Sequence, residues 1–237
     1  MGFYKLSPNG TGVRPPVTPL DPDRTLALSY VPAERRAALG ALWRLDAAMG
    51  AVLAGGREPT LSQIKLVWWR DSLAKLDEGR PPAEPVLEEA AAHILPRGIK
   101  GKQLARLEEG WSILLSQGAL SGDDLARYGL GRGALLFRFS SSLLGFQLSE
   151  PVKRAGEGWA LADLARHSND VDAKAALAAA AERLAGVTAQ RWPGPMRPLG
   201  MLAMLALRDT QRGLDAREPQ GSPARMARMF RHRLTGR

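Results

Sequence analysis

The sequence contains no cysteine and only three histidines, and these shortages exclude several kinds of site. Without cysteine there is no disulfide, no thiolate nucleophile, and no zinc or iron–sulfur centre with cysteine ligands. His93, His167 and His232 lie too far apart in the chain to show the spacing of metal ligands. No metal centre built on these residue types is therefore expected.

Long apolar runs are missing as well. No uninterrupted apolar stretch reaches the roughly 18 residues that a membrane-spanning helix needs, and the first residues lack the charged start and apolar stretch of a secretory signal. The alternation of Val, Ile and Thr that is typical of strands is rare. These absences favour a helical protein in the cytoplasm.

Positive charge is what the sequence has in excess. Its 237 residues include 33 Lys and Arg against 24 Asp and Glu, a formal net charge of +9. Such a balance favours anionic partners, which include phosphates, nucleic acids and the inner surface of a membrane, and it does not choose among them. Because no helix-turn-helix, zinc or RNA-binding motif accompanies the charge, no nucleic-acid partner is expected.

The chain divides into a short tail and one large domain. Residues 1–22 are rich in Gly and Pro, which predicts an extended tail. Residues 23–237 are dominated by Ala, Leu, Arg and Glu, which favour helices. Start and stop signals predict helices at about 23–30, 32–54, 61–78, 85–95, 100–117, 122–145, 151–167, 172–186, 198–215 and 223–234. The predicted fold is a single-domain, all-α helical bundle.

The segment from Ala33 to Leu73 has a recognisable order of residues. An arginine, Arg44, lies in a long helix, a short loop follows, and the next helix carries Trp69 and Arg70 near its end. This order resembles the N-terminal part of the squalene/phytoene synthase family. The resemblance implies a fold of the isoprenoid synthase type.

Three later segments extend the resemblance. The apolar run LARYGLGRGALLFRFSSSLLG contains Tyr128 at the position of a family tyrosine, and residues 155–167 resemble the helix that bears the second aspartate motif of the family. The segment from about residue 202 onward resembles the last two helices of the family. The resemblance therefore covers about residues 23–237, with gaps.

The departures from the family concern its magnesium site. The resemblance implies two facing Asp-x-x-x-Asp motifs, whose carboxylates hold magnesium ions against the diphosphates of two substrates. The first motif region reads DAAMGA from Asp46, which stands one position before the expected pair, and the second reads RHSNDV from Arg166, with His167 at the expected first aspartate. No two aspartates stand four apart anywhere in the chain. Consequently, no catalytic residue, metal ion or cofactor is expected.

Two hypotheses of function follow. The chain is similar to a branch of the family that lacks the aspartates and acts in the assembly of mitochondrial respiratory complex I. This similarity implies a non-catalytic protein that binds a protein partner, a lipid or an isoprenoid in an inherited cavity. The alternative is a divergent but active prenyl-diphosphate transferase that condenses two substrates head to head and holds Mg²⁺ through Asp46, Asp163 and Asp170.

Candidate ligand-binding residues each have a structural interpretation as well. The guanidinium groups of Arg44 and Arg70 match diphosphate oxygens, or they form ordinary surface ion pairs. The ring of Trp69 stacks on a ligand, or it packs in the core beside Trp68. Tyr128 lines the cavity, or it belongs to the core with its hydroxyl bonded.

The second motif region supplies the remaining candidates. Asp163 and Arg166 either face the cavity or form an ion pair with each other, because they are three residues apart on a helix. His167 is a general base or pH-sensitive group, or a satisfied structural histidine. The cavity itself is expected to be deep and mostly apolar, or else filled by Leu, Met and Phe.

The last predicted helix is strongly basic. Its arginines recur every three residues, which predicts a basic stripe along one side. The basic and apolar residues are Arg225, Arg228, Arg231, His232, Arg233 and Arg237, with Met226, Met229, Phe230 and Leu234. We expect either a peripheral contact with the inner membrane or with a partner, or a terminal helix docked on the bundle with a solvated basic edge.

Overall fold

The computed structural model describes residues 19–55 and 58–237, so most of the predicted tail, residues 1–18, lies outside the described residues. The described chain is helical, and no β-strand occurs in it, which confirms the all-α prediction. The α-helices are α1 (Pro22–Ser29), α2 (Ala33–Ala54), α3 (Pro59–Lys75), α4 (Pro85–His93), α5 (Gly101–Leu104), α6 (Leu107–Ser112), α7 (Gly122–Tyr128), α8 (Leu135–Leu143), α9 (Glu150–His167), α10 (Asp170–Leu184), α11 (Arg197–Arg212) and α12 (Pro223–Thr235).

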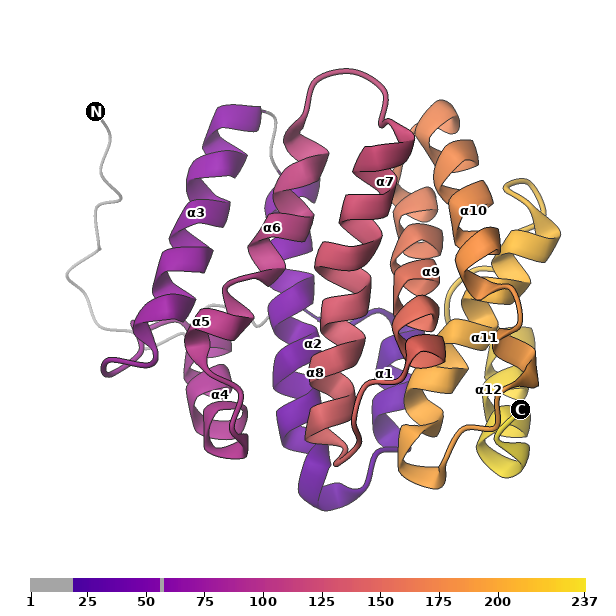
Figure 1. The fold of residues 1–237 in the computed structure, drawn as a ribbon, viewed down its shortest axis with the longest axis horizontal. Helices are drawn as coiled ribbons and strands as arrows, with labels where there is room; N and C mark the ends of the chain where they lie inside the picture. The colour runs from indigo at the N-terminus through magenta and orange to yellow at the C-terminus, as the bar shows by residue number, and fades with distance from the viewer. Residues whose placement is uncertain (1–18, 56–57) are drawn as a thin grey trace.

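The helices form a bundle with α3 at one end and α10 to α12 at the other (Figure 1). α2 packs against α1, α3, α4, α6 and α8, and α9 packs against α8, α10 and α11. Within the described part of the chain, α2 is the one helix whose length and composition would let it cross a membrane, but 56% of its most apolar window is buried inside the fold. Its apolar character is explained by its place in the core.

The helix predicted at 100–117 is interrupted, which corrects its predicted extent. It consists of α5, α6 and a 3₁₀ turn, η2 (Ile113–Leu115). Asp77 accepts hydrogen bonds from the backbone N–H groups of Gly101 (2.7 Å) and Lys102 (2.9 Å) and so satisfies the start of α5. A Cβ at Gly101 would lie 2.1 Å from the carbonyl oxygen of Leu73, so α5 begins pressed against the end of α3.

The helix predicted at 122–145 contains a π-helical segment, η3 (Gly129–Ala134), between α7 and α8. Two glycines of η3 bring backbones into direct contact. A Cβ at Gly131 would lie 2.9 Å from the Cα of Gly110 in α6, and a Cβ at Gly133 would lie 2.2 Å from the carbonyl oxygen of Gly156 in α9. η3 is therefore wedged between α6 and α9, and the residue between these glycines, Arg132, is placed in the centre of the bundle.

The basic side predicted for the last helix is only partly exposed, and the helix docks on the bundle, as the second of the two expectations had it. Arg225 is buried and pairs with Asp23 and Asp209, and the half-buried Arg228 pairs with Glu218. The helix docks on the bundle through the face that carries Arg225, because the bundle supplies carboxylates there. The solvent-facing side of α12 carries apolar residues at a four-residue spacing, together with the exposed Arg231.

Candidate functional site

A cavity of about 920 Å³ lies between the start of α1, the C-terminal half of α2, the end of α6, the α7–η3 junction and the α9–α10 turn. Its walls include Ala47 and Ala51 of α2 and Leu164 of α9. Charged side chains, among them Arg132 and Asp163, also face it. The cavity is thus kept open, and its lining mixes apolar and charged groups where a mostly apolar one was expected.

Ala47 and Ala51 occupy the positions where the family resemblance places the first pair of aspartates. Both line the cavity, so two methyl groups stand where two carboxylates would face a substrate. In the second motif region, His167 lines the cavity at the rim, while Val171 is 67% exposed at the start of α10. Neither motif region therefore offers the pair of carboxylates that the resemblance implies.

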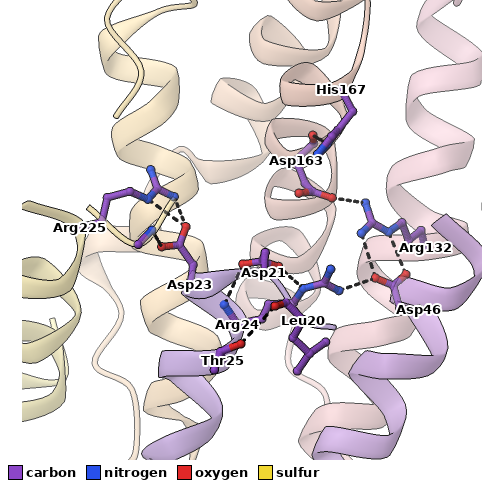
Figure 2. A network of polar contacts seen from close by, with 11 residues as sticks. Leu20, Asp21, Asp23, Arg24, Thr25, Asp46, Arg132, Asp163, His167 and Arg225 are labelled. Carbon is purple, nitrogen blue, oxygen red and sulfur yellow. Dashed lines mark hydrogen bonds and ion pairs between the residues drawn. The ribbon is translucent and has the colours of Figure 1, made fainter. Parts of the chain in front are cut away.

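A buried cluster of charges lies against the cavity (Figure 2). Asp46, fully buried, accepts hydrogen bonds from Nε and Nη2 of Arg132, both at 2.9 Å, and from Nη1 of Arg24, also at 2.9 Å. Nη1 of Arg132 reaches Oδ2 of Asp163 at 2.7 Å. Arg24 additionally pairs with Asp21, its helix N-cap residue. We call these five residues, Asp21, Arg24, Asp46, Arg132 and Asp163, the central charge cluster.

Aromatic rings enclose the guanidinium of Arg132. Its central carbon lies 4.1 Å from the ring centroid of Trp111 and 4.9 Å from that of Trp159. The indole N–H of Trp111 donates to Asp46 at 3.1 Å, and Nη1 of Arg132 donates to the hydroxyl of Tyr128 at 2.6 Å. The cation is therefore held by ion pairs in its plane and by π-faces above it, an arrangement that suits Arg and not Lys.

The surroundings of Arg132, Asp163 and Tyr128 shift their pKa values in directions that keep each group in its ordinary protonation state at neutral pH. Burial acts to lower the pKa of Arg132, but Asp46, Tyr128 and Asp163 outweigh it and raise the pKa well above its usual range. Burial acts to raise the pKa of Asp163, but Arg132 and Arg24 outweigh it and leave this pKa below its ordinary value. Burial raises the pKa of Tyr128, so its phenol stays protonated.

The residues present do not fit the magnesium site that the resemblance implies. The described part of the chain contains no group of three or more His, Asp or Glu side chains arranged to hold a metal ion. The carboxylates of Asp46 and Asp163 are already bonded to guanidinium groups, and Asp170 is exposed at the start of α10. A guanidinium thus occupies the place between α2 and α9 where a hard cation would need free oxygens.

A second ion-pair chain involves Arg166. The expected pair between Asp163 and Arg166 is absent from the described ion pairs, because Arg166 points to Asp209 (2.6 Å) while Asp163 turns to Arg132. Asp209 also binds Arg225 at 2.7 Å, and Arg225 binds Asp23 at 2.8 Å. This chain joins α1, α9, α11 and α12 next to the central charge cluster.

Three other candidates lie away from the cavity. Arg44 pairs with Glu89 of α4 at 2.7 Å, and Arg70 pairs with its exposed neighbour Asp71 at 3.0 Å. Trp69 is 8% exposed and belongs to the core, where it forms an edge-to-face contact with Trp68. The structure therefore brings Tyr128, Asp163 and His167 to the cavity wall, with Asp46 directly behind it.

His167 lies at the rim. Its Nδ1 is 2.9 Å from the backbone carbonyl oxygen of Asp163, one helical turn earlier, and its ring is exposed. If the contact is a hydrogen bond, Nδ1 donates and Nε2 remains available to the cavity. The side chain can therefore act as a polar contact for a ligand at the mouth.

Sequence reasoning missed Arg24, Arg132, Trp111 and Trp159. Arg132 carried a readable signal, because it is the one charged residue in the run GLGRGA, whose alternating glycines allow close backbone contacts. Arg24 and the two tryptophans lie on separate helices, and their convergence depends on tertiary packing. No local pattern announces such a convergence.

The comparison with protein families gives one match. A family model described as squalene/phytoene synthase matches residues 17–174, which is about two thirds of the chain. The matched region includes all five residues of the central charge cluster and ends early in α10. No curated protein and no solved structure was found to match.

Proposed function

Because the chain belongs to the squalene/phytoene synthase family, we propose that it is a non-catalytic member that binds an uncharged isoprenoid or similar lipid in the cavity. The observation that carries the proposal is that Ala47 and Ala51 line the cavity where the resemblance implies carboxylates, while Arg132 bridges Asp46 and Asp163. A diphosphate leaving group needs a divalent cation that this wall cannot hold.

The charge balance of the site favours an uncharged ligand. The central charge cluster contains two guanidinium groups and three carboxylates, so its cations are already matched. The carboxylate of Asp172 faces the same cavity. A diphosphate would enter a site with excess negative charge. It would also have to displace buried ion pairs, which costs on the order of several kcal/mol per ion.

The cavity suits a long apolar molecule with a small polar end. Its volume of about 920 Å³ is at the upper end of the roughly 300–1,000 Å³ of ligand pockets. Ala47, Ala51, Leu114 and Leu164 supply apolar wall. The hydroxyl of Tyr128 accepts from Arg132, and no described hydrogen bond uses its own proton, so this group can donate to a ligand oxygen.

The cellular process is proposed from the resemblance alone. The branch of the family without aspartate motifs acts in respiratory complex assembly, and we extend that role to this protein. It would then work with a protein partner in the cytoplasm, at or near the inner membrane. Its excess of positive charge favours binding to an anionic surface, such as that of the inner membrane.

Turnover and binding test the proposal together. The protein is incubated with geranylgeranyl diphosphate or farnesyl diphosphate and Mg²⁺, and released diphosphate is measured. We expect none above background. Tryptophan fluorescence, to which Trp111 in the cavity wall contributes, then reports titration with geranylgeraniol and with its diphosphate. We expect the alcohol to bind at least about tenfold more tightly.

Matched variants locate the binding. Ala51→Phe fills part of the cavity and is expected to weaken alcohol binding, whereas Ala178→Phe, at an exposed position of α10 outside the cavity, is expected to leave it unchanged. Release of diphosphate at enzyme-like rates would overturn the non-catalytic assignment. Tighter binding of the diphosphate than of the alcohol would overturn the ligand class.

A further inference from the structure

The outer face of α12 carries a line of exposed apolar side chains. Met226, Phe230 and Leu234 are 46%, 54% and 64% exposed. Their four-residue spacing places them on one side of the helix, one turn after another. Large apolar side chains grouped in this way on a surface indicate an interaction site more often than scattered ones do. We call these three residues the α12 stripe.

The helix that presents this stripe is firmly anchored. Its opposite face carries Arg225, Met229 and His232, which are all buried. Arg225 forms ion pairs with Asp23 and Asp209, and Arg197 donates to the carbonyl oxygen of Arg233 at 2.6 Å near the end of the helix. The stripe therefore faces outward because of how the helix is fixed, and it is not a core face that has come loose.

The charged residues of α12 itself are all basic. α12 has no acidic residue, and Arg231 and Arg233 lie on either side of the stripe by helical geometry. Arg231 and Arg237 are exposed, and neither forms an ion pair within the described residues. Arg233 is half-buried, with its guanidinium carbon 6.0 Å from the ring centroid of Tyr30.

We propose that α12 docks the protein on an anionic lipid bilayer. The helix would lie parallel to the surface, with the α12 stripe entering the boundary between headgroups and acyl chains. Arg231, Arg233 and Arg237 would meet lipid phosphates, to which they are complementary in charge. An apolar line flanked only by cations, on a helix fixed by its other face, is the arrangement of an interfacial amphipathic helix.

A second exposed apolar line, on α3, provides the contrast. Leu61, Ile64 and Trp68 are 52%, 60% and 45% exposed. The same helix carries Lys65, Arg70 and Lys75, but Arg70 is paired with Asp71 and Glu58 directly precedes the helix, so its charges are of both signs. α3 also lies at the opposite end of the bundle from α12 (Figure 1), so the two lines do not face one flat surface together. The α3 line is therefore a matched control.

Vesicle flotation tests the proposal on the full chain. The vesicles are phosphatidylcholine, either alone or with about one-third phosphatidylglycerol. We expect binding to the anionic vesicles only, with binding reduced when salt is raised from about 0.1 M to about 0.5 M, because screening weakens the arginine contacts. Phe230→Glu and Arg231→Glu are each expected to lower the partition coefficient at least about fivefold.

The controls separate docking from other effects. Ile64→Glu and Trp68→Glu on α3 should leave partitioning unchanged. The thermal melting of Phe230→Glu, Arg231→Glu and Ile64→Glu should match the wild type because these positions are exposed, whereas Trp68→Glu also loses the contact with Trp69 and serves as a control for binding alone. Failure of the wild type to bind anionic vesicles, or equal loss in the α3 variants, would overturn the proposal. Loss of self-association in Phe230→Glu without vesicle binding by the wild type would assign the stripe to a second copy of the chain instead.

Discussion

Arg132 and His232 are both basic and buried, yet their surroundings are opposite in kind. All three side-chain nitrogens of Arg132 donate hydrogen bonds, to Asp46, Asp163 and Tyr128. Neither ring nitrogen of His232 has a hydrogen-bond partner among the described residues. The comparison shows two ways to bury a basic group: one is kept charged by counter-ions, and the other is kept neutral.

The pKa values follow from this difference. The carboxylates around Arg132 raise its pKa, so the core contains a permanent cation. Burial lowers the pKa of His232 to about 4, and the like charge of Arg197 adds to this, while an interaction with the backbone of Arg237 opposes the shift only in part. The charged state of Arg132 depends on its neighbouring carboxylates, whereas the neutral state of His232 depends on its burial.

The largest effect is expected from Arg132→Met. Removing the guanidinium leaves the buried carboxylate of Asp46 with Arg24 as its remaining ionic partner and leaves Asp163 without its nearest cation. We expect the free energy of unfolding to fall by about 3–5 kcal/mol, measured by urea denaturation. The double variant Arg132→Met with Asp46→Leu should recover more than half of that loss. A cost below about 1 kcal/mol in the single variant would contradict the assigned role.

His232 predicts a loss of stability in acid. Its folded-state pKa lies below its ordinary value, so the unfolded chain takes up the proton first, and stability falls as pH drops from about 6.5 towards 4. The shift amounts to about 3 kcal/mol at most. Unfolding measured between pH 7 and pH 4 should show a shallower decline in His232→Leu than in the wild type. Equal pH dependence of stability in the variant and the wild type would show that burial does not lower the pKa of His232.

Asp163→Asn tests the more exposed end of the central charge cluster. Arg132 keeps Asp46 in this variant, so we expect a smaller loss of about 1–2 kcal/mol. Because the pKa of Asp163 is lowered, its contribution is present above the ordinary carboxyl range and disappears as pH falls below it. Calorimetric melting at neutral and at acid pH measures both the loss of stability and its dependence on pH. Asp170→Asn, at an exposed position, is the control and should melt like the wild type.

The smallest effects are expected from Arg44→Ala and Arg70→Ala. Both side chains form ion pairs outside the cavity, and that of Arg70 is largely solvated. Each loss of stability should stay within about 1 kcal/mol. Titration with geranylgeraniol should give the same dissociation constant for both variants as for the wild type. A large change in binding would show that these arginines reach the ligand after all.

Local sequence patterns predicted most of the fold. Ser121 begins α7 with the expected capping interactions, and the observed bounds of α2, α9 and α12 lie within two residues of the predicted ones. Capping residues, Pro and Gly act over a few positions, so their effect can be predicted from the local sequence. The break between α5 and α6 was missed because no Gly or Pro marks residues 105 and 106.

The site was less readable because its key contacts join distant parts of the chain. Tyr128, Asp163 and His167 were found through the resemblance, and they face the cavity. The basic periodicity of α12 predicted only part of its surface, because Arg225 faces inward to Asp23, which lies about two hundred positions earlier. Charge periodicity alone does not say which arginines meet a carboxylate and which meet water.

The bridge that Arg132 makes between α2 and α9 joins these helices without a bound metal ion. A cation that is part of the polypeptide cannot dissociate, be chelated or be exchanged. The two walls of the cavity are thus joined by a positive charge that is covalently part of the chain. This connection does not depend on the concentration of divalent ions in the cell. Reinstalling aspartates at positions 47 and 51 alone would not revive ion binding, since the guanidinium would remain as a competitor for the same space.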